Sequence, residues 1–185
     1  MMLPVCVAPL PPDATAVAEL AKVSGEDCAT FVSYRNALRN RRDHFKRHGA
    51  TATDHGVANC ETLILDGKEQ EKLFAVISSG KFTEEDSNQF RAMMLVEHAR
   101  MAADDGLVMQ IHPGSSRNHN HEIAKTYGAD RGFDIPVATS YVRELQPLLN
   151  NVGLHPNFRA VLFTLDESAY SRELAPLAGA YPSLR

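Results

Sequence analysis

The sequence of 185 residues has few cysteines and no long hydrophobic run. Its three cysteines, Cys6, Cys28 and Cys60, are odd in number and lack the spacing of metal ligands, which favours reduced thiols over a disulfide framework. No stretch approaches the roughly 20 apolar residues that a membrane helix needs, and no basic segment precedes an apolar run at the N-terminus. We therefore expect a cytoplasmic protein with no membrane partner.

The charge is nearly balanced, with 19 basic and 23 acidic residues and a formal net charge of −4. Because no face-wide basic field is evident, nucleic-acid binding is disfavoured. A hydrophobic content of 44% is typical of a soluble globular chain that buries a core. The sequence shows no interior boundary, repeat or low-complexity segment, so we expect a single domain over residues 1–185.

Helical patterns alternate with short apolar runs, which predict strands over 4–8, 50–54, 107–111 and 159–164. Whole helices between strands imply parallel pairing through right-handed crossovers. Such a series fits either an open doubly wound sheet or part of a (β/α)8 barrel. No dinucleotide or phosphate fingerprint stands in a strand–turn–helix context, which weakens the open-sheet alternative.

Capping residues predict where the central helices begin. Asp66 is a plausible N-cap for a helix over 68–78. Thr83 followed by Asp86 resembles a capping box at the start of the strongest helical pattern in the chain, which ends at Gly106.

Two other helices are predicted with less distinct ends. One runs over 32–48 with Ser33 as the potential cap, and its basic face is expected to be solvated over a buried stripe. The other runs over about 139–151, where Pro147 predicts a kink.

Two predicted strands run into polar segments that carry histidines. His55 directly follows Asp54, and His112 follows the third strand and precedes Arg117 and Asn118. Loops at the carboxyl ends of parallel strands are where α/β folds place their chemistry. The sequence therefore predicts an enzyme.

These segments resemble those of one family. Residues 42–56, Arg-Asp-His-Phe-Lys-Arg-His-Gly-Ala-Thr-Ala-Thr-Asp-His-Gly, resemble the "HF…G…SDHG" segment of uronate isomerases, also called glucuronate isomerases. Residues 110–118, Gln-Ile-His-Pro-Gly-Ser-Ser-Arg-Asn, resemble their "QLHIGALRN" strand end. Weaker matches at 128–134 and 161–166 occur in the family's order and spacing, so the resemblance covers nearly the whole chain.

The resemblance implies a metal-dependent (β/α)8 barrel of the amidohydrolase superfamily. Such enzymes interconvert D-glucuronate with D-fructuronate, and D-galacturonate with D-tagaturonate, which implies a small-molecule hexuronate as substrate and a divalent metal, most readily zinc, as cofactor. This aldose–ketose isomerisation moves hydrogen between C1 and C2. It calls for an acid and a base, a cation to polarise an oxygen, and guanidinium groups for the sugar carboxylate.

The resemblance also suggests roles for individual residues. His55 and His112 are the expected catalytic residues, either near the metal or in proton transfer, and His55 is the one possible metal ligand. The expected substrate-binding residues are Arg117, Asp54 and Asn118. Arg117 is expected to bind the sugar carboxylate or a hydroxyl, and Asp54 also to orient a neighbouring side chain. Without the resemblance, a buried and satisfied histidine is about as good an interpretation of His55 and His112 as catalysis.

Parts of the family's pattern are missing. Where its first matching strand reads "PTWRPD", residues 8–13 read Ala-Pro-Leu-Pro-Pro-Asp, so Pro11 stands in place of an arginine. The family's His-x-His metal motif and its late aspartate have no counterpart. Since a complete (β/α)8 barrel takes about 250 residues, we expect parallel (β/α) units from a TIM-type barrel with about four strands, a half barrel.

A half barrel has two open parallel edges with unpaired backbone groups. We therefore expect the isolated chain to be poorly stable, to aggregate, or to pair with the remainder of a barrel or with a second copy, and to lack isomerase activity alone. Two alternatives stay open: a metal-dependent hydrolase in which strand-end histidines activate water, and an inactive barrel fragment that needs a partner.

Overall fold

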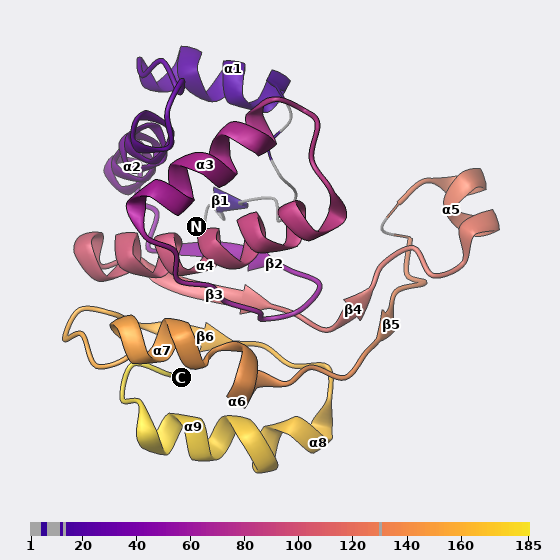
Figure 1. Cartoon of the computed structure of the whole chain (residues 1–185). Coiled ribbons are helices and arrows are strands. Elements are labelled where there is room, and N and C mark those ends of the chain that lie inside the picture. The colour runs from indigo at the N-terminus through magenta and orange to yellow at the C-terminus, as the bar shows by residue number, and fades with distance from the viewer. Residues whose placement is uncertain (1–4, 7–11, 13, 130) are drawn as a thin grey trace.

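The main sheet has four parallel strands in the order β1-β2-β3-β6. The computed structural model describes residues 5, 6, 12, 14–129 and 131–185. Within them the strands are β1 (Val5–Cys6), β2 (Ala52–Gly56), β3 (Val108–His112) and β6 (Ala160–Leu162). Each crossover adds the next strand on the same side of the sheet (Figure 1), as in a barrel, whereas a doubly wound sheet reverses its order.

Helices connect these strands and follow the last one. The connecting helices are α1 (Ala14–Ser24), α2 (Phe31–Arg47), α3 (Gly67–Ser78), α4 (Glu84–Asp105), α6 (Tyr141–Glu144) and α7 (Gln146–Val152). After β6 come α8 (Glu167–Ala169), the π-helix η1 (Tyr170–Leu174) and α9 (Ala175–Ala180). In Figure 1, α2, α3 and α4 lie beside β1 to β3, and α7 and α9 lie beside β6. No helix in the described part of the chain is long and apolar enough to cross a membrane.

The predicted caps of α3 and α4 are confirmed. The Asp66 side chain accepts hydrogen bonds from the backbone N–H groups of Lys68 and Glu69. Thr83 and Asp86 form a reciprocal capping box. These side chains satisfy backbone donors that the first turn of a helix leaves unpaired, so a local sequence signal sufficed to place both helix starts.

The prediction for the start of α2 is wrong. Thr30, with extended backbone, is the N-cap, and Ser33 is the third helical residue that completes the capping box. The basic face of α2 is also not wholly solvated, because Arg42 is only 3% exposed and its guanidinium pairs with Asp105 at 2.5 and 3.0 Å. An arginine that is buried but paired gives the same sequence pattern as a solvated one.

The helix predicted over 139–151 consists of two helices, α6 and α7, separated at Leu145. Pro147 lies in the first turn of α7, where its missing N–H removes no helical hydrogen bond. The proline therefore marks a helix start, and the prediction of one helix kinked at Pro147 is wrong.

The strand boundaries differ from those predicted. β2 starts two residues later than expected and continues through Gly56, and β3 continues through His112, because His55 pairs with Ile111 and Gly56 with His112 in the parallel ladder. β6 is shorter than predicted. Of the strand expected over 4–8, residues 5 and 6 are observed and the others lie outside the described residues. Both strand-end histidines thus belong to the sheet itself.

The two faces of the sheet differ in burial. In β2 and β3, Thr53, His55 and Ile111 are buried, whereas the alternate residues Asp54 and His112 are only partly buried. Side chains alternate between the faces of a strand, so the first set faces the helices and the second faces the open side. The helix-facing set belongs to the packed interior, which includes most of α4 from Phe90 to Ala103.

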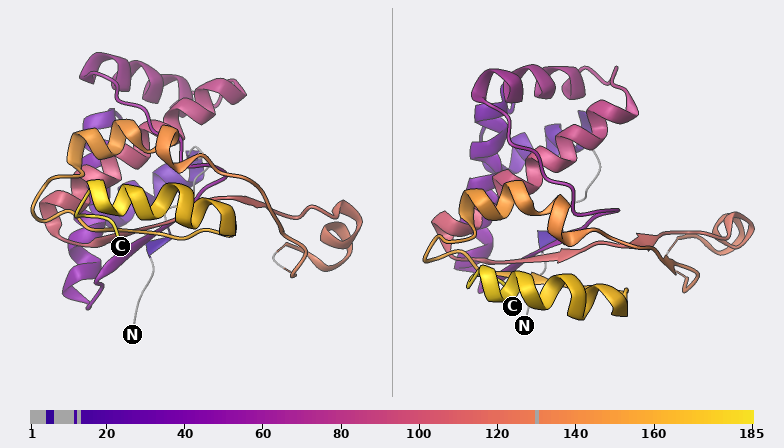
Figure 2. Two further views of the ribbon diagram at one scale, coloured as in Figure 1. Left: turned by 90° about the horizontal axis from the view of Figure 1, so that it is seen from below. Right: turned by 60° about the horizontal axis from the view of Figure 1, so that its bottom comes forward.

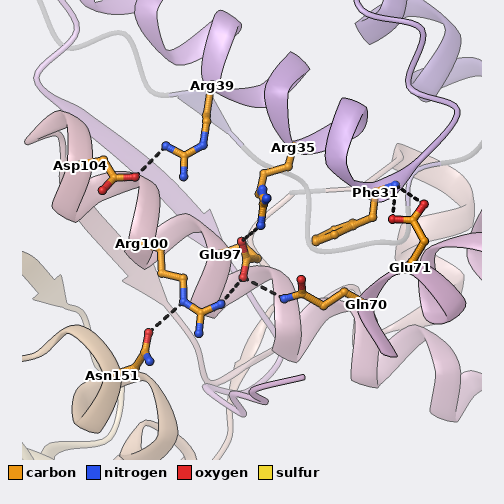
Figure 3. Close-up of polar contacts among 9 residues, drawn as sticks. All are labelled: Phe31, Arg35, Arg39, Gln70, Glu71, Glu97, Arg100, Asp104 and Asn151. Carbon is orange, nitrogen blue, oxygen red and sulfur yellow. Dashed lines mark hydrogen bonds and ion pairs between the residues drawn. The ribbon is translucent and has the colours of Figure 1, made fainter. Parts of the chain in front are cut away.

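A polar layer links the helices (Figure 3). The Glu97 carboxylate, with its side chain 2% exposed, accepts hydrogen bonds from Arg35 at 3.2 Å, Arg100 at 2.5 Å and Gln70 at 3.0 Å. Arg100 also donates to the side-chain oxygen of Asn151 at 2.9 Å. These contacts join α2 and α3 to α4, and α4 to α7, which fixes the helical layer behind the sheet.

The segment after β3 forms an arm. It contains β4 (Ser115–Ser116), α5 (His121–Tyr127) and β5 (Ile135–Pro136), and β4 pairs with β5 in antiparallel fashion. Figure 2 shows this arm projecting away from the body of the molecule. The segment after His112 was expected to be a polar loop, but it contains two short strands and a helix. Its polar sequence did not predict these elements.

Candidate active site

The carboxyl ends of β2, β3 and β6 meet at one end of the sheet, where β2 and β3 contribute polar side chains. On its open side, His112 Nε2 lies 2.5 Å from Asp54 Oδ1, which makes an ion pair when the imidazole is protonated. The two side chains are 39% and 29% exposed, whereas these two atoms are shielded from solvent. A carboxylate beside an imidazole can orient the ring and stabilise its protonated form.

Phe163 covers one face of the His112 ring. The two ring centroids are 4.1 Å apart and the planes are nearly parallel, at 9°. Phe163 follows β6, so three neighbouring strands contribute to this site. Sequence reasoning missed this residue because a phenylalanine in an apolar run indicates only a strand.

Arg117 lies beside the same pair. A Cβ placed on Gly56 would lie 3.8 Å from Arg117 Nη2 and would face the same side as Asp54, two residues earlier in the strand. The arginine itself is exposed. Its guanidinium therefore lies on the open side of the sheet, close to the ends of β2 and β3.

Asn118 occupies a turn at the base of the arm. Its φ is +54°, a left-handed conformation that asparagine tolerates better than most residues. Its backbone N–H donates to Asp134 Oδ1 at 2.9 Å. The structure thus gives Asn118 a visible role in the turn that follows Arg117.

His55 lies on the opposite side of β2 from Asp54. It is 2% exposed, its Nε2 lies 3.0 Å from Thr53 Oγ1, and its ring centroid lies 4.8 Å from that of His98 on α4. Burial, followed by the nearby charges of Arg42 and His112, lowers the pKa of His55 to about 3. The structure therefore brings Asp54, His112 and Arg117 together but places the His55 side chain on the helix-facing side of β2.

His98 completes this buried histidine pair. It is 2% exposed, and neither ring nitrogen has a hydrogen-bond partner in the structure. Burial, with the charges of His55 and Arg42, holds the pKa of His98 well below its usual value. Nothing in the local sequence indicated this pairing, because His98 stands within an apolar helical pattern.

The described residues do not form a complete metal site. Among residues 5, 6, 12, 14–129 and 131–185, no group of three or more histidine, cysteine, aspartate or glutamate side chains is placed to hold a metal ion. His55 and Asp54 are adjacent in sequence but face opposite sides of the sheet. A divalent metal at this edge would require further ligands.

Comparison with known sequences identifies a family. The family model described as Glucuronate isomerase matches residues 14–184. The uronate isomerase of Rhizobium meliloti (strain 1021) is 50% identical over 171 residues, which cover 92% of this chain and 36% of that protein. The uronate isomerase of Rhizorhabdus wittichii is 52% identical over 166 residues, which cover 90% of this chain and 36% of that protein.

Solved structures agree with these matches. The glucuronate isomerase of Caulobacter crescentus superposes with a TM-score of 0.88 at 50% identity, over 92% of this chain and 36% of that one. The uronate isomerase of Thermotoga maritima superposes with a TM-score of 0.83 at 28% identity, over 92% of this chain and 38% of that one. The predicted fold, parallel units from a TIM-type barrel, is confirmed, and the chain spans little more than a third of these relatives' length.

Proposed function

The chain belongs to the glucuronate isomerase family, and from that premise we propose that it forms part of an enzyme that isomerises hexuronates. The reaction interconverts D-glucuronate with D-fructuronate and D-galacturonate with D-tagaturonate. The observation that carries the proposal is the placement of Asp54, His112 and Arg117 on one open side of the sheet. An acid–base group and a guanidinium are two of the three elements that isomerisation of a sugar acid calls for, the third being a cation that polarises an oxygen.

His112 is the proposed acid–base catalyst. The imidazole takes the proton from C2 of the open-chain aldose, and the C1=O1 bond becomes single as a C1=C2 bond forms, which leaves an enediolate with its charge on O1. The hydroxyl proton of O2 then passes to O1. The C2=O2 bond forms as the C1=C2 bond becomes single and the imidazolium returns its proton to C1, so the product ketose has the same composition as the substrate. Asp54, 2.5 Å from Nε2, stabilises the imidazolium that exists between the two transfers.

Arg117 is the proposed binding group for the sugar carboxylate. A guanidinium presents planar, paired donors that match the two oxygens of a carboxylate, and it keeps its charge at all working pH values. Asn118 is proposed to contact a sugar hydroxyl from the adjacent turn. Both residues begin the arm, so the arm would hold the end of the substrate remote from C1.

His55 is proposed to position Asp54 from the opposite face of β2. It is buried and neutral on the helix-facing side of β2, one residue from Asp54. Its contacts with Thr53 and His98 fix that segment of the strand. We assign it the positioning of Asp54 rather than contact with substrate.

The barrel fold of this family generally binds a metal, and zinc is our proposal for its identity. The residues described here do not supply a sufficient ligand set. We also propose that residues 1–185 fold as one cytoplasmic domain, and that the open sheet edges pair with the remainder of a barrel or with a second copy of the chain.

A graft tests the proposed function. Residues 14–184 would replace the matching segment of the Caulobacter crescentus glucuronate isomerase, which is 50% identical to this chain. We expect the grafted enzyme to convert D-glucuronate, followed as formation of the ketose by NMR, and we expect the 185-residue chain alone to do so at no measurable rate.

The ungrafted Caulobacter enzyme serves as the positive control, and thermal unfolding of the graft shows whether it is folded. A folded graft with no isomerase activity would overturn the proposal. Turnover by the chain alone would overturn the expectation that it needs a partner.

A further inference from the structure

Two hydrogen bonds fix the backbone of Phe163, a residue that is 41% exposed in this chain. Its N–H donates to the carbonyl of Ile111 at 3.0 Å, which extends the β3–β6 ladder by one residue. Its carbonyl accepts a hydrogen bond from the hydroxyl of Tyr141 at 3.0 Å, and Tyr141 is 1% exposed. The backbone of Phe163 is therefore fixed from both β3 and α6.

The strand register directs Phe163 toward His112. Ile111 pairs with Leu162, and Leu162 packs against the buried core on the helix side. The following residue, Phe163, therefore faces the open side together with His112. The open side of the sheet also carries Asp54 and His112, so the Phe163 ring lies at the site and not in the helix-facing core.

The contacts of His112 restrict its ring in two directions. The nearly parallel stack on Phe163 covers one face of the imidazole, at 4.1 Å between centroids, and Asp54 meets its Nε2 edge at 2.5 Å. The stack sets the plane of the ring, whereas Asp54 sets which edge of the ring faces β2. Both restraints are needed to fix one orientation.

We propose that Phe163 is a positioning residue that holds the His112 imidazole in the orientation needed for proton transfer, an inference that rests on the proposed function. It acts through His112 and takes no proton itself. Proton transfer depends steeply on geometry, and a displacement of about 1 Å can cost on the order of 100-fold in rate.

The first experiment uses the 185-residue chain and needs no activity. NMR resonances of the His112 ring protons, assigned by their loss in His112→Asn, would be compared in Phe163→Leu and Phe163→Tyr. We expect ring-current shifts and cross-peaks to the residue 163 ring in the parent and in Phe163→Tyr. Both signatures should disappear in Phe163→Leu, because leucine has no aromatic ring.

Phe82→Leu is the matched control, because Phe82 is similarly exposed, at 39%, and has no ring contact with His112 among the described residues. It should leave the His112 resonances unchanged. If Phe163→Leu also leaves them unchanged, the stack does not exist in solution and the proposal is overturned, whatever the enzyme's activity.

The second experiment uses the grafted enzyme. Phe163→Leu should lower kcat by about 10-fold or more with KM changed by less than about 2-fold. Phe163→Tyr, which keeps an aromatic ring, should retain the kcat of the parent graft. An active graft whose kcat is indifferent to Phe163→Leu overturns the positioning role alone. A folded but inactive parent graft counts against the proposed function, and with it against this role.

Discussion

The histidines at the ends of β2 and β3 have opposite surroundings. His112 lies on the open side of the sheet, against Asp54 and Phe163, with its side chain 39% exposed. His55 is 2% exposed on the helix side, against Thr53 and His98. The difference shows that two strand-end histidines can face opposite sides of one sheet, and that only His112 lies on the side that carries Asp54 and Arg117.

The comparison predicts that the two sides of the sheet respond differently to mutation. His112→Asn in the grafted enzyme should lower kcat by about 1000-fold, the range for loss of a general acid–base group, with little change in thermal stability. Steady-state kinetics and thermal unfolding check both parts. A rate within 10-fold of the parent would contradict the assignment of His112.

Mutations on the helix-facing side of the sheet should lower stability more than they change activity. Arg42→Met should lower the free energy of unfolding by about 3 kcal/mol, because it leaves Asp105, a largely buried partner, without its guanidinium. Arg39→Met is the matched control on the same helix, since Arg39 and Asp104 form an exposed pair at 2.7 Å, and it should cost less than about 1 kcal/mol. Urea unfolding measures both; equal losses would contradict the contrast.

The buried histidine pair should make stability depend on pH. The pKa of His55 is about 3 in the folded chain, against a usual 6.5, and that of His98 is also lowered. As the pH falls below 6.5, the unfolded chain binds protons that the folded chain does not. The free energy of unfolding should therefore fall by about 1.4 kcal/mol per pH unit for His55, about 2 kcal/mol between pH 7 and 5.

Urea unfolding at pH 7, 6 and 5 checks this dependence. His55→Asn removes one titrating group, so its stability should fall less steeply with pH than that of the parent. Parallel curves for the parent and the variant would show that His55 is not buried in its neutral form.

The smallest effect should come from the substrate-binding arginine. Arg117→Met in the grafted enzyme should raise KM for D-glucuronate by about 10-fold, because a charge-assisted hydrogen bond to the carboxylate contributes roughly 1.5 kcal/mol. Arg131→Met, on the same arm, serves as the control and should leave KM unchanged. An unchanged KM in Arg117→Met would remove Arg117 from the binding site.

Local signals predicted much of the fold. Asp66 and Thr83 were identified as caps because a cap depends on residues two or three positions away. The strand boundaries were less predictable. Residues 50–54 are weakly hydrophobic, and the strand extends through His55 and Gly56 because they pair with β3, which lies more than fifty residues further along the chain.

The sequence by itself determined the alternation of strands and helices, the family, and the residues Asp54, His112 and Arg117 as candidates for chemistry. Only the tertiary structure decided that His112 meets Asp54, that Phe163 covers its ring, and that His55 faces His98. The physical reason is the two-residue period of a strand: a side chain's face depends on register with distant strands, and local sequence does not encode that register.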